Sequence, residues 1–304
     1  MAHARARTGS ARFIDPVVLS RIGNLELVAR SVVDGFISGL HRAPFLGVSI
    51  DFAEHRAYMP GDDIRRIDWR VFARTDRFYV KEFEADTNAN FSVVLDVSKS
   101  MDFAKDGISK LDYARFLAAS LTYLCSKQRD RVGLITFDGD VVDIVPPSAK
   151  HLDTVLHTLD RLKPGKQTEF ARPMSKVAES LSRRGILLLI SDLYDDPDVV
   201  VNAVNLLRLR GNDLIVFQVL DPSEVTFSFH TSTTYEDLET GERIPVVPER
   251  LRTEYQQRVQ AHLAALQRKF GENDIDYAFF DTSMPLDHAL FRFLSKRERM
   301  SRVR

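Results

Sequence analysis

Cysteine is almost missing from this chain of 304 residues. Its one cysteine, Cys125, has no second cysteine with which to form an internal disulfide. A chain without disulfides fits a reducing, cytosolic setting. The sequence also lacks any apolar run near the roughly 18 residues that a membrane helix needs. Its first residues lack the apolar stretch of a secretory signal. We therefore expect a cytoplasmic protein without membrane insertion.

The chain also lacks an excess of charge of either sign, since it has 42 Lys and Arg residues and 43 Asp and Glu residues. The formal net charge of −1 gives no reason to expect binding to nucleic acid or to an anionic membrane. Two catalytic signatures are missing as well: the phosphate loop Gly-x-x-x-x-Gly-Lys-Ser/Thr and the nucleophile elbow Gly-x-Ser-x-Gly. None of the eight histidines lies in a recognisable catalytic motif.

From residue 91 onwards, strand-like apolar runs alternate with segments of helical periodicity. This alternation predicts an α/β fold with a doubly wound, mostly parallel six-stranded sheet and helices on both faces. Asp138-Gly139 lies between two β runs and is typical of a hairpin turn, so one edge strand should be antiparallel. The expected strands cover residues 91–97, 132–137, 141–145, 186–190, 214–220 and 275–280.

The first 90 residues have a different pattern. Residues 16–40 carry apolar positions at helical spacing, whereas residues 42–90 are rich in charged and aromatic side chains. A β insertion is expected at 225–247. Neither it nor 42–90 is large enough to form its own core, so we expect the two to pack together as a small layer beside the sheet. The expected organisation is a disordered tail at 1–12, an N-terminal helical and β extension at 13–90, and the main domain at 91–304.

The segment Asp96-Val97-Ser98-Lys99-Ser100 directly follows the first strand of the main domain. One carboxylate and two hydroxyls at alternate positions provide the hard oxygen ligands that Mg²⁺ and Mn²⁺ favour. In open α/β sheets, ligands bind in the crevice beyond the carboxyl ends of the strands. Both the chemistry and the position therefore predict a cation site here.

Thr168 and Asp192 fall where such a site needs further ligands. Thr168 lies in a loop before a helix, and Asp192 ends a later central strand. Each residue alone has a structural explanation, because serines and threonines often cap helices and Asp192 can be a turn acid. Taken together, the residues favour one oxygen-rich metal site made of Asp96, Ser98, Ser100, Thr168 and Asp192.

This set resembles the metal-ion-dependent adhesion site of von Willebrand factor A domains, whose pattern is Asp-x-Ser-x-Ser, a distant Thr and a distant Asp. The resemblance implies that Ser98 and Ser100 bind Mg²⁺ or Mn²⁺ directly and that Thr168 can do so in the ligand-bound form. It implies that Asp96 and Asp192 bind directly or through water. An Asp or Glu of a partner often completes the octahedron in that family.

The stretch from Arg56 to Trp69, Arg-Ala-Tyr-Met-Pro-Gly-Asp-Asp-Ile-Arg-Arg-Ile-Asp-Trp, carries a longer signature. It resembles the bacterial domain-of-unknown-function family numbered fifty-eight, in which this signature precedes a von Willebrand A-like domain. The resemblance implies association with MoxR-type AAA ATPases in the maturation or metal loading of other proteins.

The polar residues of this signature have two explanations. Paired acids beside arginines can dock a partner or take part in catalysis. Alternatively, they can close a Pro-Gly turn and pair with one another, with the tryptophan as a packing anchor. The residues concerned are Asp62, Asp63, Arg65, Arg66, Asp68, Trp69 and Arg74.

The sequence as a whole favours a non-enzymatic, divalent-metal-dependent protein-interaction module. Its partner would be a MoxR-type AAA ATPase, a client protein presenting Asp or Glu to the metal, or both. The alternative is a Mg²⁺-dependent phosphatase or hydrolase on a Rossmann-like fold. Phosphatases of the haloacid-dehalogenase type need a second aspartate two residues after the nucleophile, and Ser98 stands there instead. A scaffold with a decayed metal site is disfavoured because all five ligand positions carry the expected residue types.

Overall fold

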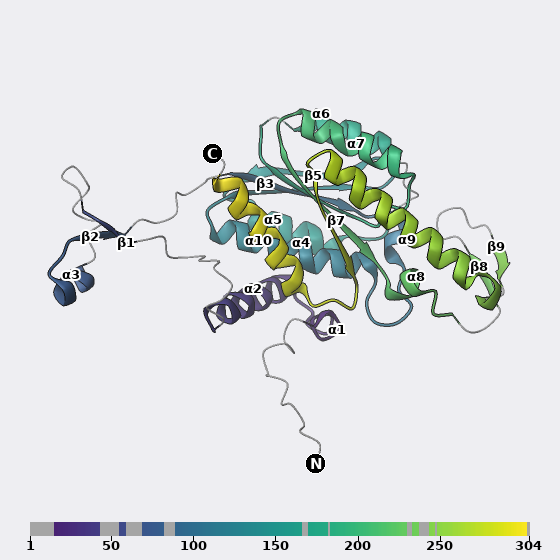
Figure 1. Ribbon diagram of the computed structural model, residues 1–304, viewed down its shortest axis with the longest axis horizontal. Helices are drawn as coiled ribbons and strands as arrows, with labels where there is room; N and C mark the ends of the chain where they lie inside the picture. The colour runs from purple at the N-terminus through teal and green to yellow at the C-terminus, as the bar shows by residue number, and fades with distance from the viewer. Residues whose placement is uncertain are drawn as a thin grey trace, which may run out of the picture.

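A six-stranded sheet forms the centre of the molecule, in the order β10-β7-β6-β3-β4-β5 (Figure 1). The computed structural model describes residues 15–42, 55–58, 69–81, 89–165, 170–181, 183–229, 233–236, 243–246 and 248–302. All neighbouring strands are parallel except β4 and β5, which pair antiparallel at one edge. The strands of this sheet are β3 (Asn90–Asp96), β4 (Arg131–Phe137), β5 (Val141–Ser148), β6 (Ile186–Ser191), β7 (Asp213–Leu220) and β10 (Asp276–Asp281). This arrangement confirms the predicted von Willebrand A-like α/β fold.

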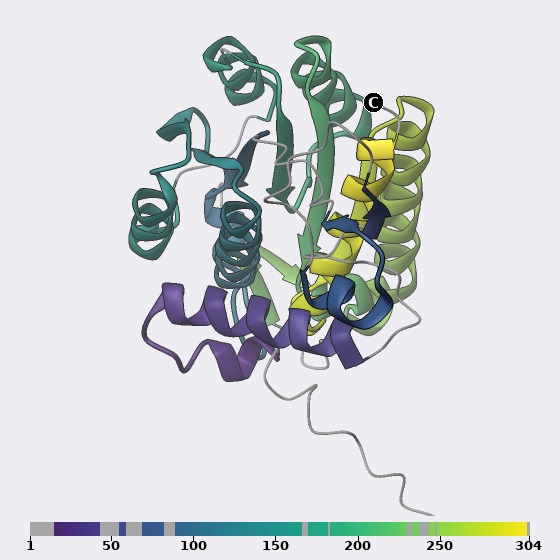
Figure 2. The same cartoon turned by 90° about the vertical axis from the view of Figure 1, so that its left-hand side faces the viewer.

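Helices cover both faces of the sheet, and α2 lies on the opposite side from α6 and α7 in Figure 2. Because β3 and β6 are covered on both sides, their side chains are buried on both faces, as is typical of central parallel strands. One core includes side chains of α2 (Leu25–Arg42), α4 (Lys110–Lys127), α5 (Leu152–Arg161) and α10 (Leu286–Arg302). The other includes α6 (Ala171–Ser180), α7 (Pro197–Leu209) and α9 (Pro248–Glu272).

The N-terminal helices contribute to the main core. Residues 16–40 were expected to be helical and form a short α1 (Pro16–Leu19) followed by α2. The apolar face of α2 packs on α4, with Val28, Val32 and Val33 fully buried. This helix therefore belongs structurally with the sheet, although the sequence pattern grouped it with the N-terminal extension.

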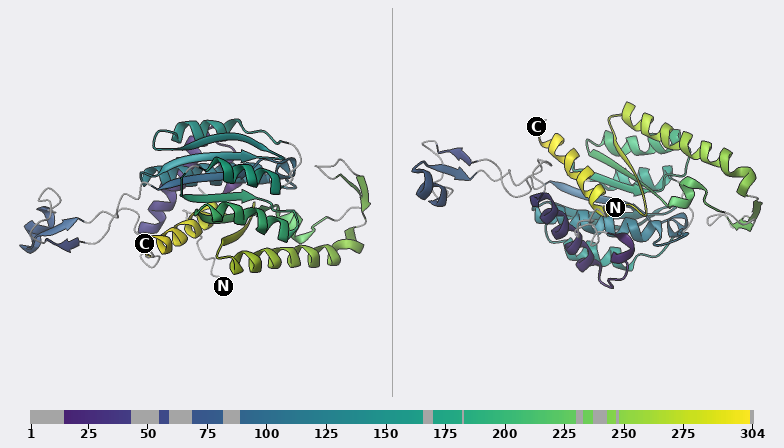
Figure 3. Two further views of the ribbon diagram at one scale, coloured as in Figure 1. Left: turned by 90° about the horizontal axis from the view of Figure 1, so that it is seen from above. Right: turned by 60° about the horizontal axis from the view of Figure 1, so that its bottom comes forward.

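The expectation that residues 42–90 and 225–247 pack together is wrong. The first segment contains β1 (His55–Ala57), α3 (Trp69–Thr75) and β2 (Tyr79–Lys81), with β1 and β2 paired to each other. The second contains β8 (Thr233–Glu236) and β9 (Arg243–Val246), which form another separate pair. The two pairs lie at opposite ends of the molecule (Figures 1 and 3).

Topology explains this separation. The first segment leads into the amino end of β3, whereas β8 and β9 follow the carboxyl end of β7, after the short α8 (Pro222–Thr226). Since β3, β6 and β7 are parallel, the amino end of β3 and the carboxyl end of β7 lie at opposite ends of the strands. Below, the two sides of the sheet on which the parallel strands begin and end are called its amino edge and its carboxyl edge. Each segment also has local contacts of its own, such as the stacking of Phe72 on Phe78 at 4.4 Å between ring centroids.

Truncation of Phe293 tests the packing of α10. Its ring is fully buried and packs edge-on against Phe91 on β3, with 5.4 Å between ring centroids. We expect Phe293→Ala to lower the free energy of unfolding by about 3–5 kcal/mol in chemical denaturation. The control is Leu209→Ala, whose side chain is 82% exposed, with an expected change below about 0.5 kcal/mol. Equal effects of the two substitutions would contradict this packing.

Candidate metal centre

The candidate centre lies where β3 and β6 end side by side. The two strands are parallel and pair through Leu95 and Ile190, so Asp96 comes next to Ser191 and Asp192 at the carboxyl edge of the sheet. Asp96, Ser98 and Asp192 are buried, and Ser100 is half-buried. The structure thus places four of the five predicted ligands at this edge. Thr168 lies outside the described residues.

Hydrogen bonds hold Asp96 and the two serines in place. The backbone N–H of Ser98 donates to Asp96 Oδ1 at 2.9 Å, and the Ser191 hydroxyl donates to Asp96 Oδ2 at 2.6 Å. The hydroxyl oxygens of Ser98 and Ser100 lie 3.0 Å apart. Ligands at right angles around Mg²⁺, each about 2.1 Å from the ion, are separated by about 3 Å, so this pair has the spacing of two adjacent ligands.

The capping explanation does not account for Ser98. Ser98 precedes the 3₁₀ turn Lys99–Asp102, but its side chain makes no capping hydrogen bond there. The helix that follows, α4, is capped instead by Ser109, whose hydroxyl accepts from the N–H of Asp112 at 3.1 Å. The Ser98 hydroxyl is therefore directed toward Ser100 instead of toward a helix end.

Lys110, which the sequence analysis missed, is part of the centre. Its ammonium is fully buried and donates to Asp192 Oδ2 at 2.9 Å and to Glu224 Oε1 at 2.8 Å. Burial lowers the pKa of Lys110, but the two carboxylates outweigh burial and raise it above its ordinary value. The signal in the sequence was a lysine in the first turn of a helix that is apolar on most sides, and nothing local indicated its partners.

Asp96 is in an environment that opposes its negative charge. Burial, followed by repulsion from Asp192, raises the pKa of Asp96 to about 7, although hydrogen bonds from Ser191 and Ser98 act in the opposite direction. A bound cation removes this conflict, because it favours the ionised carboxylate. Each carboxylate oxygen has a second lone pair, so the hydrogen bonds on Asp96 leave room for another contact.

The donor set fits a hard divalent cation. In the part of the chain that the structure describes, no group of three His, Cys, Asp or Glu side chains could hold a metal ion. A site at this edge therefore depends on the paired hydroxyls of Ser98 and Ser100 together with Asp96 and Asp192. Such an all-oxygen set with neutral ligands suits Mg²⁺ or Mn²⁺ more than softer metals.

Of the candidate signature residues, the structure describes Trp69 and Arg74, and these two lie away from the centre. Asp62, Asp63, Arg65, Arg66 and Asp68 lie outside the described residues. Trp69 and Arg74 lie in α3, which is at the opposite end of the molecule from α8 in Figure 1. Glu224 of α8 flanks the centre, so α3 and its two signature residues are remote from it.

Comparisons with known proteins support a family assignment. A family model described as "Protein of unknown function DUF58" matches residues 54–265. An uncharacterized protein of Mycobacterium tuberculosis is 29% identical over 262 residues, which covers 84% of this chain and 81% of the relative.

Among solved structures, the conserved hypothetical protein BatB from Bacteroides thetaiotaomicron is 19% identical with a TM-score of 0.49, covering 69% of this chain and 99% of its own. An aerotolerance-related membrane protein from Bacteroides fragilis is 20% identical with a TM-score of 0.48, covering 68% of this chain and 99% of its own.

The comparisons correct one expectation. The predicted cytoplasmic location is contradicted by the comparisons, because similar structures include one described as an aerotolerance-related membrane protein, from Bacteroides fragilis. Within the described ranges, no helix has the length and apolar character needed to cross a bilayer.

Asp96→Asn tests the metal centre. The substitution keeps the shape of the side chain but removes its charge, so we expect Mn²⁺ binding to fall below detection in calorimetry while the far-ultraviolet circular dichroism is unchanged. Wild-type binding should itself be weak, since most ligands are neutral hydroxyls. Asp102→Asn, an exposed acid in the adjacent turn, is the matched control and should leave the affinity unaltered. An unchanged affinity in Asp96→Asn would refute the site.

The raised pKa of Asp96 predicts a pH-dependent stability. The folded protein binds the proton of Asp96 up to a pH of about 7, whereas the unfolded chain loses it near the ordinary 3.8. After EDTA treatment, the free energy of unfolding should therefore fall as the pH rises from about 5 to about 7.5. Asp96→Asn should reduce this slope, and Mg²⁺ should stabilise the wild type more at the higher pH, because the ion needs the carboxylate ionised. An identical dependence of the unfolding free energy on pH in the wild type and in Asp96→Asn would contradict the raised pKa of Asp96.

Proposed function

Because this chain belongs to the DUF58 family, as its signature predicted, and folds as a von Willebrand A-like domain, we propose that it is a non-enzymatic protein-interaction module whose binding depends on a divalent cation. The fold itself favours an interaction module. The metal dependence rests on one observation: the hydroxyls of Ser98 and Ser100, 3.0 Å apart, lie beside a buried carboxylate at the carboxyl edge of the sheet.

The residues of the centre have separate tasks in this proposal. Ser98, Ser100, Asp96 and Asp192 hold the cation, whose chemistry is to attract an acidic side chain of a partner in exchange for water. The ammonium of Lys110 offsets negative charge on Asp192 and Glu224. Without Lys110, the uncompensated charges of Asp192 and Glu224 would weaken the attraction of the centre for an incoming Asp or Glu.

The surroundings suit an acidic partner. Lys99 is exposed within the loop that carries both serines. The Tyr194 side chain, 45% exposed, borders the same place and lies over Lys110, with 4.8 Å from the ammonium to the ring centroid. A cationic and an aromatic side chain beside a metal provide one charged and one apolar contact around the carboxylate of a partner.

The family resemblance supports a more specific role, as an accessory of a MoxR-type AAA ATPase in protein maturation or assembly. In that role the metal centre would contact the ATPase itself or a client protein that presents Asp or Glu.

The phosphatase alternative is not supported by the geometry of Asp96. A nucleophilic aspartate must present an oxygen to the substrate, but Asp96 is 1% exposed. Both of its oxygens accept hydrogen bonds, from Ser98 and Ser191. Ser98, two residues later, has no carboxylate to act as the general acid or base.

Co-purification with a MoxR-type ATPase tests the proposal. We expect a complex in the presence of Mg²⁺ that is lost with EDTA and weakened at least about tenfold by Ser100→Ala or Thr168→Ala, since each removes a ligand. Ser20→Ala is the matched control, because Ser20 is an exposed serine at the end of α1. A complex that forms equally well with EDTA and in both ligand variants would show that the metal centre is not the binding surface.

A further inference from the structure

The described residues also form a pocket at the other edge of the sheet. This pocket of about 450 Å³ opens where the parallel strands begin, and the residues at its wall include Asn90 at the start of β3 and Arg131 at the start of β4. Gly185, before β6, and Asn212, before β7, complete that wall. Since Asp96 ends β3, the length of this strand separates the pocket from the candidate metal centre.

The short helix α6 explains why the pocket is open. It has ten residues and ends at Ser180, after which the chain turns back through Leu181 toward β6. Among the described residues, α6 packs against β5 but ends beside the pocket, and Ile144 of β5 is 51% exposed. Gly185 allows the strands to approach closely here, because a Cβ at this position would collide with the backbone carbonyl of Asn90.

All charged residues that line the pocket carry a positive charge. Three of its 17 residues are cationic, namely Arg131, Lys150 and Arg183, and none is acidic. This departs from the chain as a whole, in which 43 acidic residues outnumber 42 basic ones. Within the described residues, none of these three cations forms an ion pair with a carboxylate.

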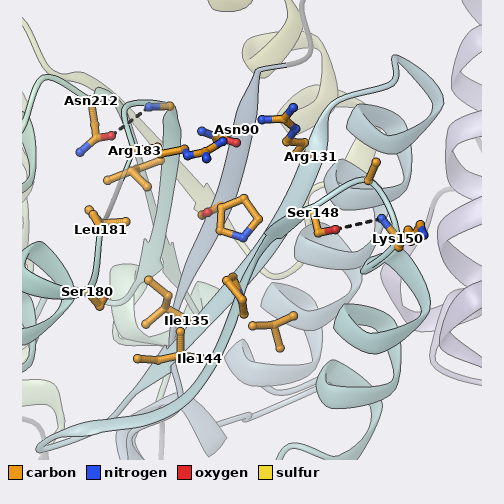
Figure 4. Close-up of a pocket in the computed structure, with 17 residues that line it drawn as sticks. Asn90, Arg131, Ile135, Ile144, Ser148, Lys150, Ser180, Leu181, Arg183 and Asn212 are labelled. Atoms are coloured by element: carbon orange, nitrogen blue, oxygen red, sulfur yellow. Dashed lines mark hydrogen bonds between the residues drawn. The ribbon is translucent and has the colours of Figure 1, made fainter.

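The polar and apolar parts of the pocket are separated. Figure 4 shows Asn90 with Arg131 and Arg183 at one end, and Ile135 with Ile144 at the other. The amide of Asn90 is oriented by donating to the carbonyl of Arg184 at 3.1 Å. This arrangement offers guanidinium groups to an anion and an apolar surface to whatever carries that anion.

We infer that this pocket binds a small organic acid, with a carboxylate or phosphate held by Arg131 and Arg183 and an apolar body over Ile135 and Ile144. The volume of the pocket lies within the range of small-molecule sites. Guanidinium groups bind such oxyanions with two parallel hydrogen bonds, which gives both strength and orientation. This inference is independent of the proposed metal centre, since the two share no residue.

Calorimetry with octanoate, octyl phosphate and octanol tests the inference on the full chain. The two acids distinguish a carboxylate from a phosphate head, and octanol has the same apolar body without charge. We expect at least one acid to bind and octanol to bind at least about tenfold more weakly, because the charged contacts are lost. Failure of both acids to bind, or equal binding of octanol, would overturn the inference.

Three variants locate the binding. Arg131→Gln and Arg183→Gln should each weaken the bound acid about tenfold, and Ile144→Glu should abolish binding by placing a like charge in the pocket. The matched control is Arg258→Gln, an arginine on α9 whose side chain is 79% exposed and paired with Glu254. Thermal melting confirms that each variant is folded. Unchanged affinity in all three pocket variants, or an equal loss in Arg258→Gln, would place the acid elsewhere.

Discussion

The pairing of β3 between β4 and β6 is the constraint on which the rest of the structure depends. From Phe91 to Asp96 every side chain of β3 is buried, because helices cover both of its faces. A strand buried in this way cannot shift its register without exposing apolar side chains and losing paired backbone groups. Its carboxyl end therefore places Asp96 beside Asp192, and its amino end places Asn90 beside Gly185. Both sites take their positions from this one strand.

Lys110 adds a second constraint at the carboxyl edge. Its ammonium joins three elements, since Lys110 lies in the first turn of α4, Asp192 follows β6, and Glu224 lies in α8. Glu224 is itself fixed by a capping box with Asp221, whose N–H donates to the second oxygen of Glu224 at 2.7 Å. A buried charge network of this kind contributes little net stability over an apolar core, but it is costly to break at one partner. It therefore keeps the loops around Asp96 in one arrangement.

Local sequence patterns were sufficient where the determining contacts are local. The apolar runs predicted the central strands, and Asp138-Gly139 predicted the antiparallel pair of β4 and β5. The convergence of Asp96 and Asp192 followed from a general property of parallel sheets and needed no knowledge of side-chain contacts. Lys110 could not be predicted, because its partners Asp192 and Glu224 are 82 and 114 residues away in the chain. The placement of β1–β2 and β8–β9 failed for a related reason, since composition says nothing about which edge of the sheet a segment joins.

The dipoles of α4 and α6 bear on the cationic lining of the pocket. Helices α4 and α6 begin at the carboxyl edge of the sheet and end at the amino edge, where their dipoles favour cations. Arg131 and Arg183 follow the ends of α4 and α6, so the dipoles alone give a reason for basic residues there. Arginines that served only this purpose would be expected to hydrogen-bond to the last carbonyls of those helices. Over the described ranges, neither guanidinium makes such a bond, and both line the pocket with Asn90 between them (Figure 4). The dipoles thus explain why cations are favoured at this edge, and the pocket explains why these two leave their donors facing open space.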